Sequence, residues 1–237
     1  FDSRTMAAAA NLASLRNLLE RRFPNALPLV HTTAGAVSTG IEVLDQALPA
    51  GGFPRGRLST WSQGPGATAF LHATGRAVLA SGERAAWIDG AGVASGSGWA
   101  EGPFLLRPRE PIQGLRWAEE LLRSSGFALV VITGTYAADR EWVRLSRAAR
   151  EGGSALVAVG GAQRMAALRL TSCIPPWGFG WRRDPQGEPI ALPWVTLQVR
   201  VMGLGWSREV EVQLPVDDDE LRLSVEPALA DRRGATR

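Results

Sequence analysis

The chain has 237 residues, of which 45% are hydrophobic, and a formal net charge of +3. This length allows one large domain or two small ones, and the composition is that of a globular protein with a full hydrophobic core. One cysteine and two histidines exclude a disulfide framework and a histidine-based metal centre. No apolar run approaches the ~18 residues of a membrane span, so we expect a cytoplasmic protein without membrane contact.

The N-terminal residues 6–23 are predicted to form an amphipathic helix, because leucines recur at helical spacing and Pro24 follows. A linker is expected up to residue 37. The chain then divides into an N-terminal helix and linker (1–37), a main domain (38–226) and a flexible tail (227–237). We expect the helix either to pack on its own main domain or to mediate self-association with a second copy.

After a short predicted helix at 41–48, strands and helices are predicted to alternate from Arg57 to residue 159. The apolar run 127–133 is typical of a parallel strand buried on both faces. This alternation predicts an α/β fold, in which a mainly parallel central sheet is covered by helices. The predicted strands are 57–62, 84–89, 104–107, 127–133, 154–159 and 167–173, and the predicted helices are 41–48, 67–81, 111–124 and 137–151.

The pattern changes after Gly160. Cys173 lies in the predicted strand 167–173, in an apolar context, and we expect it to be buried. Residues 174–193 are rich in proline, glycine and tryptophan and are predicted to be a loop. Residues 193–202 and 206–214 alternate apolar and polar side chains, which predicts an antiparallel hairpin with one solvated face at the sheet edge. A last short strand is predicted at 221–225.

A glycine-rich loop between the predicted strand 57–62 and the helix after it has the layout of a phosphate site. Backbone amides converge at such a helix N-terminus, and the helix dipole adds positive potential. A functional P-loop also needs a lysine and a hydroxyl residue after its second glycine. Here the end of the loop is apolar, so the stretch reads as a degenerate nucleotide site: Gly64, Gly66, Ala69, Phe70 and Leu71.

The chain has 26 arginines and no lysine. No part of this sequence can therefore supply a phosphate-binding lysine or a Schiff-base lysine. Arginine is a poor substitute for a compact ammonium group in a tight loop. We expect no nucleotide cofactor.

Residues 38–65 contain the motif S-T-G-x-x-x-L-D-x-A-L-x-A-G-G-x-P-x-G-R, followed by a strand and G-P, and residues 105–124 contain L-L-R-P-R, then L-x-W-A-E-x-x-L and Ser124. The first stretch resembles the opening of the ATPase core of the RecA recombinases, and the second is similar to the RecA-like mutagenesis family ImuA. ImuA shares its fold with the cell-division inhibitor SulA. The resemblance implies a RecA-like core over residues 38–214. The residues that carry the RecA likeness are Ser38, Thr39, Gly40, Leu44, Asp45, Ala47, Leu48, Ala50, Gly51, Gly52, Pro54, Gly56, Arg57, Gly64 and Pro65.

The chain departs from the RecA pattern at the positions that carry catalysis. The P-loop lysine falls on Ala69 or Phe70. The general-base glutamate falls on Ala91, and the Walker B aspartate, which positions Mg²⁺, falls on Thr133. The glutamine that senses the γ-phosphate falls near Gly161. These losses predict a pseudo-ATPase, a protein that is not an enzyme.

Two groups of residues are candidates for contact with a partner or with DNA. Arg140, Arg144 and Arg147 share one face of the predicted helix 137–151, with Arg150 close by. They could bind phosphate or form an ordinary solvated surface. The second group combines aromatic rings with arginines, as single-strand binding sites and protein hot spots do: Trp177, Phe179, Trp181, Arg182 and Arg183, which Arg164 and Arg169 could extend.

The resemblance implies an accessory role in damage-induced mutagenesis, as part of the SOS response and of translesion synthesis during DNA repair. The partners it implies are RecA and the Y-family polymerase homologue ImuB. Three alternatives stay open: a SulA-like inhibitor that binds FtsZ, a plain single-stranded DNA-binding protein, and an ATPase with rearranged site residues.

Overall fold

The computed structural model describes residues 35–92, 94, 99, 102–161 and 164–216. The chain divides into two units, Phe1–Thr33 and Ala34–Arg237, and all described residues belong to the second. The predicted helix at 6–23, the predicted strand at 221–225 and the tail at 227–237 lie outside the described residues. Among the helices that are described, none has the length and apolar character that a membrane span requires.

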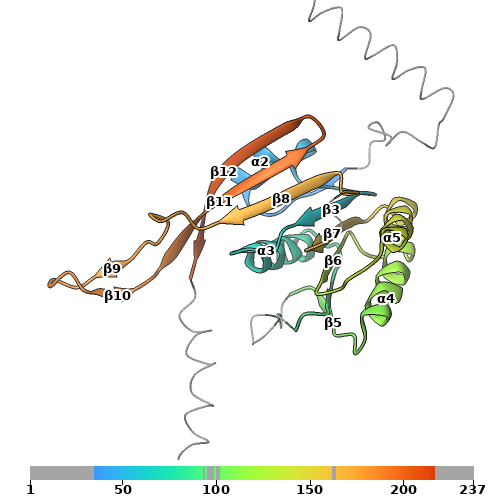
Figure 1. Ribbon diagram of the computed structural model, residues 1–237, viewed down its shortest axis with the longest axis horizontal. Coiled ribbons are helices and arrows are strands. Elements are labelled where there is room, and N and C mark those ends of the chain that lie inside the picture. Colours follow the sequence, from blue (N-terminus) through green and yellow to red (C-terminus); the bar gives the residue numbers. More distant parts are fainter. Residues whose placement is uncertain (1–34, 93, 95–98, 100–101, 162–163, 217–237) are drawn as a thin grey trace, which may run out of the picture. The chain divides into compact units, whose positions relative to one another are not determined.

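Eight strands form one central sheet in the order β12–β11–β8–β3–β7–β6–β4–β5 (Figure 1). The strands from β8 to β5 run parallel, whereas β11 is antiparallel to both β8 and β12. The predicted mainly parallel sheet with an antiparallel hairpin at its edge is confirmed. The strands are β3 (Leu58–Trp61), β4 (Ala85–Asp89), β5 (Phe104–Leu106), β6 (Leu129–Thr133), β7 (Ala155–Val159), β8 (Leu168–Cys173), β11 (Trp194–Gly203) and β12 (Trp206–Pro215).

Helices cover both faces of the parallel strands and create two cores. Successive residues of β6 alternate between them: Val131 belongs to the core under α3 (Ala67–Ala80), and Ile132 to the core under α4 (Pro111–Arg123) and α5 (Asp139–Gly152). The short helix α2 (Glu42–Ala47) packs against β12 on the α3 side. This double burial explains why the parallel strands are continuous apolar runs.

The hairpin β11–β12 has the predicted apolar and polar faces. Val199 and Val201 are buried, whereas Arg200 is exposed and pairs with Glu209 across the hairpin at 3.0 Å. The expectation of a buried Cys173 is wrong. Its thiol is exposed, because it lies opposite Gln198 on the face that no helix covers.

The expectation of a plain loop at 174–193 is also wrong. This segment contains an antiparallel ribbon formed by β9 (Arg182–Arg183) and β10 (Pro189–Ala191). A tight turn closes it, in which the Asp184 carboxylate accepts the backbone amides of Gln186 and Glu188 at 3.0 and 2.8 Å. The other small sheet pairs β1 (Ala36–Val37) with β2 (Phe53–Pro54), with the 3₁₀ turn η1 (Pro49–Gly51) before β2.

Candidate functional site

The end of the glycine-rich loop is filled by aromatic packing. Gly66 adopts a left-handed conformation (φ +79°) and begins α3. Phe70, in the first turn of α3, is fully buried, and its ring stacks on that of Trp61 with centroids 5.2 Å apart. Leu71 is also fully buried, whereas Ala69 is exposed. Of the two residues aligned with the P-loop lysine, one therefore lies in the core and the other on the surface.

The same loop is held against the antiparallel half of the sheet. The Trp61 indole donates to the Ser172 hydroxyl at 3.1 Å, and that hydroxyl donates to the Pro65 carbonyl at 2.7 Å. A Cβ at Gly66 would lie 2.5 Å from the Leu197 side chain. Contacts from β8 and β11 thus fix the loop closely over Phe70.

Thr133, at the end of β6, stands where the Walker B aspartate would be and lies next to Asp89 at the end of β4. Thr133 is buried, and its hydroxyl donates to the Asp89 carboxylate at 3.1 Å and accepts from the Trp87 indole at 3.4 Å. The second carboxylate oxygen of Asp89 accepts the backbone amide of Ala94 at 3.0 Å and lies 3.7 Å from Arg107. Asp89 is thus committed to bonds that fix the loops after β4 and β6.

The position of the lost general base lies against the backbone that follows β6. A Cβ at Gly134 would be 2.3 Å from the Ala91 nitrogen, and Gly134 has a positive φ of +63°. The amide of Gly90 donates to the Thr133 carbonyl at 2.9 Å. The two loops are therefore in van der Waals contact where the general base and the Walker B aspartate would stand.

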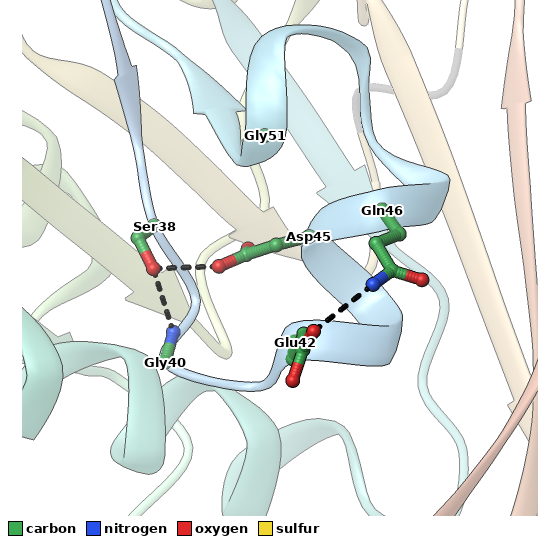
Figure 2. A pocket seen from close by; sticks show the side chains of 6 residues that line it. All are labelled: Ser38, Gly40, Glu42, Asp45, Gln46 and Gly51. Atoms are coloured by element: carbon green, nitrogen blue, oxygen red, sulfur yellow. Dashed lines mark hydrogen bonds between the residues drawn. The ribbon is translucent and has the colours of Figure 1, made fainter.

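The motif that opens the main domain has a structural role (Figure 2). Asp45 accepts the Ser38 hydroxyl at 2.6 Å and the Thr39 amide at 2.8 Å, and so fixes the turn before α2. Gln46 donates to Glu42 along the helix at 3.2 Å. Ser38, Glu42, Asp45 and Gln46 line a pocket, but these hydrogen bonds serve the turn and the helix themselves.

The arginines of α5 take part in ion pairs with carboxylates. Arg144 pairs with Glu119 of α4 at 2.8 Å, and Arg147 pairs with Glu151 at 2.8 Å. Arg123 bridges both carboxylates, at 3.0 and 3.8 Å. This network favours a solvated, paired surface for Arg144 and Arg147. Arg140 is exposed at the start of the helix.

Arg150 instead lies close to Arg57 at the start of β3. Burial, and then the charge of Arg150, lower the pKa of Arg57. Arg164 and Arg169 are exposed. Arg169 belongs to the same uncovered face of β8 as Cys173, opposite Met202 of β11.

The aromatic residues of the segment 174–194, which we call the aromatic ribbon, remain accessible. The side chains of Trp177, Phe179 and Trp181 are 43–59% exposed. Arg182 and Arg183 follow them in β9 and are exposed. The structure therefore leaves this predicted group exposed, whereas Arg144 and Arg147 are paired with carboxylates.

A further surface lies between the edge strand β5 and helix α4. Phe104 of β5 is 59% exposed, and Ile112 of α4 is also exposed. Two adjoining pockets share Trp117 and Glu120, and one of them is also lined by Phe104, Leu121 and Phe127. Sequence reasoning missed this surface, because a sequence does not say which strand will be at the edge of a sheet. We call it the β5–α4 groove.

Comparison with known proteins places the fold. No family model and no curated protein matches the sequence. Among solved structures, a RadB recombinase is similar, with a TM-score of 0.55 and 18% identity over 76% of this chain and 96% of that chain. This likeness shows a RecA-like fold. It does not extend to the ImuA family, whose relationship to this chain is a proposal.

Proposed function

We propose that this chain is a non-catalytic RecA-like accessory protein of damage-induced mutagenesis, which acts in translesion synthesis by binding partners. The observation that supports it best is the position of Phe70, buried against Trp61 where a P-loop would present its lysine. Thr133 and Ala91 stand at the magnesium and general-base positions. The protein therefore keeps the fold of an ATPase but uses it to bind partners.

The proposed protein partners are RecA and the polymerase homologue ImuB. The β5–α4 groove supports this part of the proposal. An edge strand has unpaired backbone groups along one side, and an adjoining apolar groove can hold side chains of an added strand. Arg116 and Glu120 on the rim of the groove supply charges of both signs for selecting the partner.

The first test is a calorimetric titration of the protein with ATP in the presence of Mg²⁺. We expect no saturable heat, because the chain has no lysine and the loop is packed with apolar side chains. An active RecA-type ATPase in the same buffer is the positive control. Saturable binding by this protein would contradict the pseudo-ATPase proposal and favour an ATPase with rearranged site residues.

The second test measures the affinity of immobilised RecA and ImuB for the Phe104→Glu variant. A charge at this exposed edge position should weaken binding about 30-fold, the effect expected of a hot-spot residue. Leu204→Glu is the matched control, because Leu204 is 94% exposed at the far turn of β11–β12. Equal affinities of the two variants would show that the β5–α4 groove is not the binding site for these partners. Capture of FtsZ in place of RecA and ImuB would favour the SulA-like alternative.

A further inference from the structure

The aromatic ribbon leaves the rings of Trp177, Phe179 and Trp181 exposed. Figure 1 shows β9 and β10 extending beyond the ends of β8 and β11. Gly178 accepts the Thr196 amide at 2.7 Å, and the Gly180 amide donates to the Trp194 carbonyl at 3.1 Å. These bonds continue the pairing of β11 and fix the start of the ribbon.

Two glycines explain why the rings are not packed down. A Cβ at Gly180 would lie 2.1 Å from the Trp194 indole, and one at Gly178 would lie 2.6 Å from the Thr196 carbonyl. Only glycine allows this approach to β11. The Trp181 amide donates to the Phe179 carbonyl at 3.0 Å in a tight turn at Gly180, and the two rings on either side of this glycine stay exposed.

The spacing of these two rings fits a nucleobase. The rings of Phe179 and Trp181 are nearly parallel, at 23°, with centroids 6.4 Å apart. Stacked nucleotides rise about 3.4 Å per step, so a base between two rings needs about 6.8 Å. An opening of a few tenths of an ångström would therefore admit one base.

The charge beside the rings is suited to phosphate. Arg182 and Arg183 follow Trp181 directly and are exposed. Arg183 donates to the Gly187 carbonyl at 2.7 Å, which holds its guanidinium near the turn. The neighbouring carboxylate of Asp184 accepts two backbone amides of that turn. Two exposed cations thus follow the aromatic rings directly along the ribbon.

We infer that the aromatic ribbon binds single-stranded nucleic acid. Bases stack on Phe179 and Trp181, while Arg182 and Arg183 contact phosphates. A single strand is required because the bases of a duplex are already stacked on one another. Binding is tolerant of sequence, because every base has a π-face. The inference rests on the proposed function, since it gives one ligand to a protein that acts by binding.

The test measures fluorescence anisotropy of a labelled oligothymidylate titrated with the full chain. Trp181→Ala and Phe179→Ala should each weaken binding by about 5- to 150-fold, the range for one lost stacking contact. Arg182→Gln should reduce the slope of log affinity against log salt by about 0.7. Ile190→Ala is the matched control, because Ile190 is 57% exposed on the same ribbon and has no ring.

The expected pattern is binding of the single strand, little binding of a blunt duplex, and loss in the ring variants but not in Ile190→Ala. Absence of single-strand binding, or ring variants with unchanged affinity, would overturn the inference. An equal loss in Ile190→Ala would also overturn it, since that result indicates a general apolar contact with a protein. These failures leave the proposed function standing if RecA or ImuB is still bound and ATP is not.

Discussion

Replacing Phe70 by alanine is expected to lower the free energy of unfolding by about 3–5 kcal/mol. The Phe70 ring is fully buried, stacks on Trp61 and belongs to the same core as Leu197, so its removal leaves a cavity between α3 and the sheet. Urea denaturation followed by circular dichroism measures the loss. In a working phosphate loop the residue at this position faces the ligand, and its removal would cost little stability.

Two lysine variants sharpen this prediction. Ala69→Lys should change stability by no more than about 0.5 kcal/mol, because Ala69 is exposed. Phe70→Lys should destabilise the fold more than Phe70→Ala, because it also buries an ammonium group. If Phe70→Ala lowers the free energy of unfolding by less than about 1 kcal/mol, the loop tolerates a cavity in place of the Phe70 ring. The pseudo-ATPase proposal would then lose its main structural support.

The elements that sequence reasoning found are those in which buried and exposed faces follow a regular pattern along the chain. Residues 127–132 form an uninterrupted apolar run because β6 contributes to both cores. The alternation around Val199 and Arg200 predicted a half-solvated hairpin for the same reason. In each case the pattern along the chain reflects which faces of the element meet apolar neighbours.

Other features depend on contacts between residues far apart in the sequence. The helical spacing of Arg144 was visible, but its ion pair with Glu119 of α4 was not. The exposure of Cys173 depends on β11 pairing with β8 and on no helix covering that face. Strand order decides such features, and local residue patterns do not encode it.

The candidate sites divide in the same way. The absence of lysine and the apolar residues at 69–71 were visible in the sequence. The hydrogen bond from Ser172 to Pro65 joins residues 107 positions apart, so the contact of β8 with the loop could not be seen in the sequence. The ribbon turn carried a local signal, an aspartate and a proline followed by a glycine, that could have predicted β9–β10.

The Gly134→Ala variant is expected to lose about 2–5 kcal/mol of unfolding free energy. About 1–2 kcal/mol comes from the positive φ, and about 1–3 kcal/mol from the clash of the new methyl with the Ala91 backbone. Gly153→Ala is the matched control, because Gly153 has a φ of +71° but open space around it. It should lose only the strain, about 1–2 kcal/mol.

The difference between these two glycine variants measures how firmly the loops after β4 and β6 are held together. A difference of about 1–3 kcal/mol means that the backbone at Ala91 cannot move away from Gly134 at low cost. A water molecule or a metal ion then has no easy access between the positions of the general base and the Walker B aspartate. Equal losses would mean that the two loops separate readily, and an ATPase with rearranged site residues would again be the better explanation of this fold.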